Sequence, residues 1–300
     1  MGARRLKPSV TSPILRLLGR VMRKFLLLLF AIALLASAGC SSPVATKAPV
    51  EPNAEKPSAS QATTLVPPPT TPVPSQRPPA PAWADPYKGK LIVGVVTKEP
   101  VVALTIDDVG ASDMKPLVDA LVANDLHATL FCSGSEMTTE AAAYAAQHGI
   151  EVANHSWNHV AIGWYRPAAA NAQIMQTAKI IEEGTGEWPL WYRAPFQGYK
   201  SQGRRAVAAA GMLAAGVSND PLDYHGYTGT TLVKRISRRL KPGQIVLLHH
   251  YPQTIATFPA IAQELRRRGY QTLTMSELAQ TGKPATSVWQ LQPFARFFGH

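Results

Sequence analysis

The chain has 300 residues, a formal charge of +11 and two cysteines. Residues 1–39 contain seven Lys or Arg and no acidic residue, so the remainder has a formal charge of only +4. This excess does not indicate a nucleic-acid partner. It is typical of a solvated surface, and it would suit a mildly anionic setting such as a cell envelope.

The N-terminal region has the layout of a secretory signal peptide. Residues 25–38 are a continuous apolar run after Arg23 and Lys24, and the run is too short to span a membrane comfortably. We therefore expect residues 1–39 to be a signal peptide with a basic N-terminal extension. Met22 is an alternative start of the chain.

Ser37-Ala38-Gly39-Cys40 resembles the lipobox of bacterial lipoproteins, with Ser at the position where Leu is usual. The resemblance implies that Cys40 is acylated and holds the protein on a membrane. The alternative is ordinary cleavage after a small residue, which would release a secreted protein. Lipidation of Cys40 would leave Cys132 without a disulfide partner, and we expect Cys132 to be a small buried residue rather than a nucleophile.

Residues 41–86 are rich in Pro, Ala, Thr and Ser and contain very few large apolar residues. Such a segment cannot bury enough surface to offset its chain entropy. We expect residues 40–86, from the lipidated cysteine onward, to form a disordered tether. Pro-rich chain extends by about 3 Å per residue, so the tether would hold a catalytic domain away from a membrane.

From Lys90 onward, short β-branched runs alternate with longer helical stretches, which predicts an α/β domain over residues 87–282. The expected strands cover residues 101–106, 127–131, 150–153, 190–193, 213–217, 245–248 and 270–273. The expected helices cover residues 115–124, 139–147, 171–183, 204–210, 232–240 and 259–268. Residues 283–300 are expected to be an aromatic C-terminal tail that packs on the domain.

Seven alternations of strand and helix favour a distorted (β/α) barrel with about seven parallel strands, and a flat doubly wound sheet is the alternative. The polar residues favour the barrel, because they come at or just after the carboxyl ends of the expected strands, where active sites of such barrels assemble. These residues are Asp107, Asp108, residues 155–159, residues 193–196, Asp220 and His249.

His155 and His159 lie four residues apart, and Asp107-Asp108 ends an earlier strand. Two imidazoles and one carboxylate can bind a divalent metal and leave a position open for water. The adjacent carboxylates would repel each other unless a cation intervenes. Taken separately, the histidines could share an exposed helix face and the aspartates could belong to a turn before Gly110.

Five separated motifs over about residues 101–278 resemble those of one family. They are Thr105-Ile106-Asp107-Asp108, His155-Ser156-Trp157-Asn158-His159, Arg193-Ala194-Pro195-Phe196, Asp220-Pro221-Leu222-Asp223-Tyr224 and Leu247-Leu248-His249. The family is the polysaccharide deacetylases, carbohydrate esterase family 4, which includes peptidoglycan N-acetylglucosamine deacetylases and chitin deacetylases.

The resemblance implies a role for each of these residues. Asp108, His155 and His159 would bind Zn²⁺ or another divalent transition metal. Asp107 would be the general base, and Arg193 would orient it. The backbone N–H of Phe196 would face the oxyanion.

By the same resemblance, His249 would be the general acid and Asp220 would polarise it. Tyr224 would line the substrate groove. Trp157, inside the histidine motif, could stack on a sugar ring. We expect His250 to have a local hydrogen-bonding role.

The expected activity is removal of acetyl groups from N-acetylglucosamine residues of a polysaccharide, with peptidoglycan as the expected polymer. The expected location is the membrane, where a lipoprotein would face the periplasm or cell wall. Two alternatives are an O-acetyl esterase acting on xylan or another glycan, and a non-catalytic lipoprotein that binds wall glycan.

Overall fold

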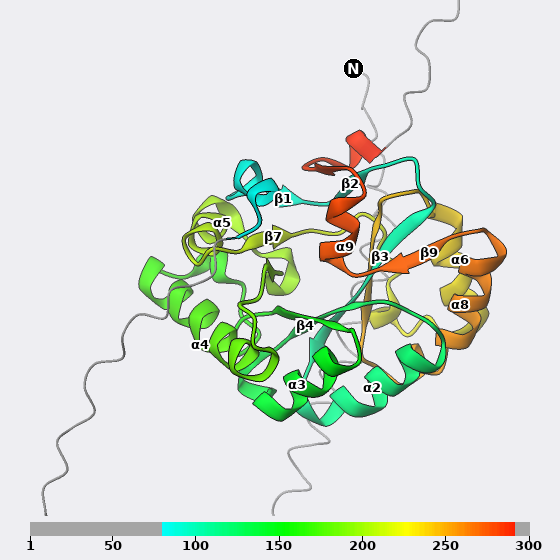
Figure 1. The fold of residues 1–300 in the computed structure, drawn as a ribbon, viewed down its shortest axis with the longest axis horizontal. Helices are drawn as coiled ribbons and strands as arrows, with labels where there is room; N and C mark the ends of the chain where they lie inside the picture. Colours follow the sequence, from blue (N-terminus) through cyan, green and yellow to red (C-terminus); the bar gives the residue numbers. More distant parts are fainter. Residues whose placement is uncertain (1–79, 292–300) are drawn as a thin grey trace, which may run out of the picture. The chain divides into compact units, whose positions relative to one another are not determined.

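The computed structural model describes residues 80–291, and its centre is a curled sheet of parallel strands (Figure 1). The strands of this sheet are β1 (Leu91–Ile92), β3 (Val101–Val109), β4 (Thr129–Cys132), β5 (Glu151–Asn154), β6 (Trp191–Tyr192), β7 (Leu213–Ala215), β8 (Ile245–His249) and β9 (Gln271–Leu273). Their order is β1-β7-β6-β5-β4-β3-β8, and β9 pairs with the first part of β3.

The chain after β7 brings one edge of the sheet toward the other. Asn219 forms a parallel bridge with Val246 of β8, and the amides of Ser218 and Asn219 both donate to the carbonyl of Ile245. The sheet therefore curls into the distorted (β/α) barrel predicted from the sequence, and the flat doubly wound alternative is wrong.

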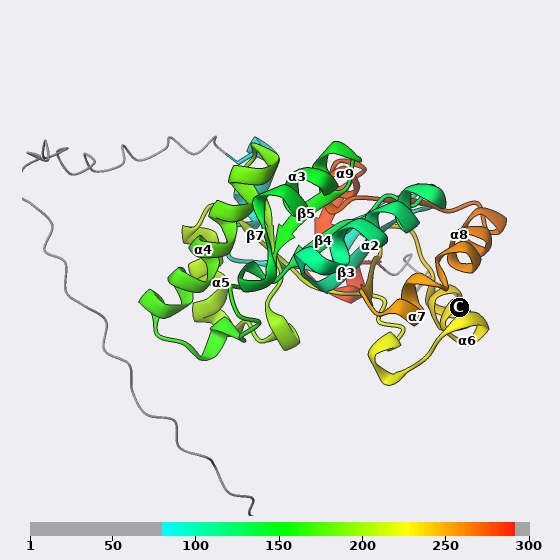
Figure 2. The same cartoon turned by 90° about the horizontal axis from the view of Figure 1, so that it is seen from below.

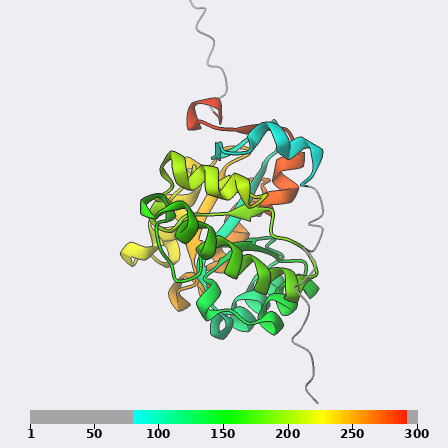
Figure 3. The same ribbon diagram turned by 90° about the vertical axis from the view of Figure 1, so that its left-hand side faces the viewer.

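Helices surround this sheet. The α-helices are α2 (Ala111–Ala123), α3 (Thr139–Gln147), α4 (Pro167–Thr185), α5 (Lys200–Ala209), α6 (Gly229–Arg239), α7 (Pro252–Ile255), α8 (Phe258–Arg267) and α9 (Met275–Gln280). Figure 2 shows α4 and α5 on one side of the barrel and α6 and α8 on the other. Seen from the first of these sides, the green helices lie in front of the strands (Figure 3).

Six short 3₁₀ segments complete the list of elements. They are η1 (Ala82–Tyr87), η2 (Gly134–Glu136), η3 (Ile162–Trp164), η4 (Pro195–Gln197), η5 (Asp223–His225) and η6 (Val288–Leu291). Three of them, η3, η4 and η5, follow β5, β6 and β7, so they lie in the loops where those strands end.

The alternation of side chains along β3 separates two apolar layers. Val102, Leu104 and Ile106 belong to the cluster that packs against the helices, whereas Val101 and Ala103 belong to the cluster inside the barrel. Successive side chains of a strand point to opposite faces, so the odd-numbered residues from Val101 to Asp107 share the inner face, before the irregularity that puts Val109 in the outer cluster. Residue 107 is therefore directed toward the barrel interior at the carboxyl end of the strand.

A two-stranded antiparallel ribbon lies beside the barrel, formed by β2 (Gly94–Val96) and β10 (Lys283–Ala285). Gly243 accommodates it: its φ is +73°, and a Cβ there would lie 1.8 Å from the carbonyl oxygen of Val95. Only glycine tolerates both conditions. This contact explains how so short a ribbon is held against the strands.

The structured domain is longer than the predicted one at both ends. Segment η1 lies partly within residues 40–86, the predicted tether, and its Ala84 is fully buried. β10 and η6 lie within the predicted tail, and Leu291 is buried. The signal peptide, Cys40 and most of the tether, together with residues 292–300, lie outside the described residues. Between residues 80 and 291 the helices are too short or too polar to cross a membrane.

Candidate active site

The aspartate pair and the histidine pair are brought together at the carboxyl ends of β3 and β5. Asp107 and Asp108 lie where the pairing of β3 with β4 shifts register, between Ile106 and Val109. At this irregularity Asp108 has a φ of 66°, and His159 beyond β5 has a φ of 55°. The bulge turns two neighbouring carboxylates in different directions.

Asp108, His155 and His159 form a cluster suited to a metal ion, because one ligand atom from each lies within 4.8 Å of the others. The same Asp108 Oδ1 is 3.1 Å from His155 Nε2 and 2.9 Å from His159 Nε2. Burial alone would raise the pKa of Asp108, but hydrogen bonds from the two histidines outweigh it and hold the pKa well below its usual range. The hydrogen bond to Asp108 likewise raises the pKa of His159.

The tautomer of His155 supports metal binding at this cluster. His155 Nδ1 is 2.9 Å from the backbone carbonyl oxygen of Arg193, which can only accept, so Nδ1 carries the proton. In the neutral ring, Nε2 would then present a lone pair to the Asp108 carboxylate. The two groups can stay this close only if Nε2 also carries a proton, which it donates to Asp108, or if a cation lies between them. Metal-binding histidines are commonly fixed in this way by a backbone carbonyl. The donor set of one carboxylate and two imidazoles fits zinc and similar divalent metals.

Asp107 is adjacent to this cluster but is held by a different partner. Arg193 Nη1 donates to Asp107 Oδ1 at 2.6 Å and to Thr105 Oγ1 at 2.8 Å, while Nη2 donates to the carbonyl of Gly216. The guanidinium is fully buried and lies 4.1 Å from the ring centroid of Phe131. The second oxygen of Asp107 is 3.9 Å from His155 Nε2, so the carboxylate is fixed beside the metal cluster.

The partner of His249 is Asp223, and the prediction that Asp220 polarises it is wrong. Asp223 is fully buried, and its carboxylate receives the His249 backbone N–H at 2.7 Å and lies 2.8 Å from His249 Nδ1. Asp220 instead accepts from the Leu222 amide and the Tyr224 hydroxyl. The turn between the two aspartates places Leu222 at a φ of 63°, and this turn directs the second carboxylate inward.

The environment of His249 favours its protonated form. Desolvation acts to lower its pKa, but the hydrogen bond and charge of Asp223, with smaller contributions from Asp107 and Asp108, raise it above the ordinary value. His249 is also the register partner of Asp107 in the pairing of β8 with β3. An imidazole whose pKa is raised and a fixed carboxylate therefore lie at the ends of neighbouring strands.

Aromatic rings surround these polar groups. Phe196, in η4, is 79% exposed and its ring centroid is 4.9 Å from that of His159, so its backbone lies next to the metal cluster. Tyr224 is 44% exposed, and its ring centroid is 5.3 Å from that of His249. Trp157 is half-buried, and a Cβ added at Gly134 would come within 2.8 Å of its ring, so Trp157 packs against η2.

Two neighbours of the site were not predicted from the sequence. Thr105 is fully buried and links Arg193 to the carbonyl of Val246. Tyr251 stacks on His249 with ring centroids 5.5 Å apart. Thr105 lies two residues before Asp107 on β3, so the alternation of side chains along a strand could have placed the two on the same face. His250 has the expected local role, with Nδ1 3.4 Å from the Asp107 carbonyl oxygen.

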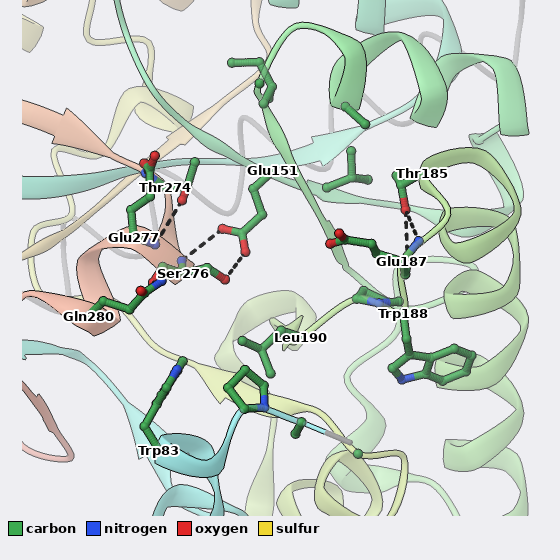
Figure 4. Close-up of a pocket in the computed structure, with 18 of the residues that line it drawn as sticks. Trp83, Glu151, Thr185, Glu187, Trp188, Leu190, Thr274, Ser276, Glu277 and Gln280 are labelled. Atoms are coloured by element: carbon green, nitrogen blue, oxygen red, sulfur yellow. Dashed lines mark hydrogen bonds between the residues drawn. The ribbon is translucent and has the colours of Figure 1, made fainter. Parts of the chain in front are cut away.

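A separate cavity of about 920 Å³ opens at the opposite end of β5, around Glu151 (Figure 4). The Glu151 carboxylate accepts from Thr129 Oγ1 at 2.6 Å and from the hydroxyl and amide of Ser276. Desolvation raises its pKa despite these hydrogen bonds. The cavity lies at the amino end of a strand whose carboxyl end leads into His155, so it is not part of the site described above.

Comparisons with known proteins find sequence similarity to polysaccharide deacetylases. Residues 94–215 match the sequence profile of the family described as polysaccharide deacetylase. The peptidoglycan-N-acetylmuramic acid deacetylase PdaC of Bacillus subtilis is 31% identical over 187 residues, which cover 61% of this chain and 39% of that protein. The peptidoglycan-N-acetylglucosamine deacetylase PgdA of Listeria monocytogenes is 26% identical over 181 residues, covering 59% and 38% of the two chains.

A solved structure gives the same fold. The crystal structure of a family 4 carbohydrate esterase pseudoenzyme from Bacillus anthracis superposes with a TM-score of 0.60 at 23% identity, covering 64% of this chain and 69% of the other. At that identity the similarity establishes the fold alone. The chain spans about two fifths of the length of the two curated relatives.

Proposed function

Residues 94–215 match the polysaccharide deacetylase family, and from this similarity we propose that the protein is a metal-dependent hydrolase that removes acetyl groups from N-acetylglucosamine residues of peptidoglycan. One observation carries the proposal. A metal-ligand cluster, a carboxylate fixed by Arg193 and an imidazole paired with the buried Asp223 converge at the carboxyl ends of β3, β5 and β8. Together these groups can polarise an acetamide, take a proton from water and protonate the leaving amine.

The metal would be held by Asp108, His155 and His159, with zinc as the first choice for this donor set. When bound there, it would act as a Lewis acid on the acetamide carbonyl and on the attacking water. Phe196 would add a backbone N–H for the developing oxyanion, and one such donor contributes about 3 to 4 kcal/mol in other acyl-transfer sites.

Asp107 is proposed to take the proton of the attacking water. Arg193 holds one of its oxygens, so the other is directed toward the metal cluster. A positioned general base accelerates such reactions by about 100- to 10,000-fold. Arg193 acts through Asp107 and is therefore a positioning residue.

His249 is proposed to donate a proton to the departing amine. An amine is a poor leaving group without that proton, so the reaction depends on an imidazole that stays protonated near neutral pH. The contacts with Asp223 favour this state. An alkoxide released from an O-acetyl ester needs the proton less, so this feature favours amide over ester hydrolysis.

The two curated relatives support a peptidoglycan substrate, because both act on N-acetyl sugars of that polymer by name. They differ in the sugar, N-acetylmuramic acid for one and N-acetylglucosamine for the other. A non-catalytic role is disfavoured, since a glycan-binding surface gains nothing from a buried Arg193–Asp107 pair beside a metal-ligand cluster. We further propose that the protein is exported and anchored through a lipidated Cys40.

The test uses the chain from Ser41 onward, loaded with zinc and incubated with N-acetylated peptidoglycan and with O-acetylated xylan. The expected result is release of acetate from peptidoglycan, lost with excess chelator and lost in Asp107→Asn. Acetate from xylan alone would favour the ester alternative. Absence of acetate from both substrates would contradict the proposed activity.

A further inference from the structure

An exposed aromatic ring with a cation above it lies on the loops that follow β5 and β6. Trp164, the last residue of η3, is 71% exposed, and the Nζ atom of Lys200 is 2.9 Å from its ring centroid. Lys200 begins α5. The two residues come from different loops, so their meeting is a feature of the folded domain.

These two loops are joined next to the metal cluster. The amide of Gly163 donates to the carbonyl of Gly198 at 2.9 Å, and the Gln202 side chain donates to the carbonyl of Gly163 at 2.7 Å. Phe196, two residues before Gly198, packs edge-on against His159. The Trp164–Lys200 pair therefore adjoins the side of the site that carries the metal histidines.

The two loops that carry Trp164 and Lys200 lack acidic residues. Residues 155–181 and 188–219 contain no Asp or Glu. Lys200 is exposed and forms no ion pair with any residue between 80 and 291. The ammonium of Lys200 is thus available to an external anion.

The backbone between the two loops is held in a costly conformation. Phe196, Gln197 and Lys200 have φ values of 56°, 54° and 41°. Non-glycine residues in this region cost of order 1 to 3 kcal/mol each, and such strain concentrates at functional sites. Here the strained segment contains both Phe196, which packs against His159, and Lys200.

We propose that Trp164 and Lys200 form a subsite for a sugar ring that bears a carboxylate, next to the sugar whose acetyl group is removed. This inference rests on the proposed function and adds a specificity element to it. The indole face would stack on the apolar face of the pyranose ring, and the ammonium would bind the carboxylate. The tryptophan thus recognises a sugar and the lysine recognises its charge.

The opposite side of the site has a different charge. Tyr224, beside His249, is hydrogen-bonded to the carboxylate of Asp220. The Asp220 carboxylate disfavours a second carboxylate beside Tyr224, whereas Lys200 attracts one, so the charged neighbour is expected on the Trp164 side. The preferred substrate is a glycan in which a neutral N-acetylated sugar alternates with a carboxyl-bearing one, and a neutral homopolymer should be poorer.

The experiment compares two substrates of equal length with the zinc-loaded chain from Ser41 onward. One is a peptidoglycan glycan strand freed of its peptides, which keeps the carboxyl groups, and the other is a neutral chitooligosaccharide. The readout is kcat/KM for acetate release at low and high salt. Lys200→Gln is compared with Lys179→Gln, a matched exposed lysine in the second half of α4.

We expect the wild-type protein to prefer the charged strand and Lys200→Gln to reduce that preference about fivefold, the strength of one exposed ion pair. High salt should have the same effect on the wild type, and Trp164→Ala should lower kcat/KM on both substrates. Lys179→Gln should leave the preference unchanged. An equal effect of Lys200→Gln on the two substrates would overturn the inference while the proposed function stands. Absence of acetate from both substrates with the wild type would overturn both.

Discussion

Asp107 and His249 are register partners on the neighbouring parallel strands β3 and β8. Neighbouring strands lie about 4.8 Å apart, and paired residues direct their side chains to the same face of the sheet. Each residue also has its own fixed partner, Arg193 for Asp107 and Asp223 for His249. The backbone pairing thus sets the spacing between the proposed base and the proposed acid, and the two buried partners set their charges.

The pH profile of the reaction tests the acid. Activity requires protonated His249, whose pKa is raised by Asp223, so the alkaline limb of kcat/KM should lie above the pKa of an ordinary histidine. Asp223→Asn removes the charge and should move that limb to lower pH. Asp220→Asn is the matched control and should leave the limb in place. If the alkaline limb shifts in Asp220→Asn but not in Asp223→Asn, then Asp220 polarises His249, and the partner assigned from the structure is wrong.

Two variants should show that metal binding and turnover depend on different residues. Asp107→Asn removes the proposed base but none of the cluster atoms, so it should keep one equivalent of zinc and lose activity by about 100- to 10,000-fold. His155→Ala removes a ligand and should lose both metal and activity. The measurements are zinc content after dialysis and acetate release. Loss of zinc in Asp107→Asn would show that Asp107 is itself a ligand.

The fold should depend strongly on Arg193. Arg193→Met leaves the buried Asp107 carboxylate without its cation, and breaking a buried pair in this way costs about 3 to 5 kcal/mol of unfolding free energy. Urea unfolding measures this change. Arg239→Met, at an exposed position of α6, should change the unfolding free energy by no more than about 0.5 kcal/mol. Equal stability of the two variants would mean that the guanidinium is not structurally required.

Glu151 should make stability fall as pH rises. Its pKa is raised by desolvation, so the folded protein favours the neutral carboxyl, and ionisation above the ordinary pKa of 4.5 opposes folding. The loss should develop as pH rises from that value through the higher pKa of the folded state. The unfolding free energy of wild type relative to Glu151→Gln should therefore decrease as the pH rises above 4.5. A constant difference would contradict this reading of the Glu151 environment.

The motifs at the strand ends allowed much of the site to be predicted. Parallel strands in a barrel bring their carboxyl ends together, so the separated residues Asp108, His155 and Arg193 could be expected to meet. The choice between Asp220 and Asp223 could not be made in this way. It depends on the left-handed backbone of Leu222, with a φ of 63°, which the sequence did not indicate.

The short elements were the least predictable part of the fold. β1, β2 and β10 contain only two or three residues each, too few to show an alternation of side chains. Their pairing depends on contacts far away in the sequence, such as that of Gly243 with Val95. The long strand β3 and helix α3, which have clear hydrophobic patterns or caps, were predicted close to their observed bounds.

The central claim is that Asp108, His155 and His159, without Asp107, bind a catalytic metal. The most direct measurement is anomalous diffraction at the zinc edge from crystals of the zinc-loaded protein. We predict one ion bonded to these three side chains at about 2.0 to 2.2 Å, with Asp107 still paired to Arg193. An ion bound elsewhere, or one that draws Asp107 away from Arg193 into its coordination sphere, would contradict the claim.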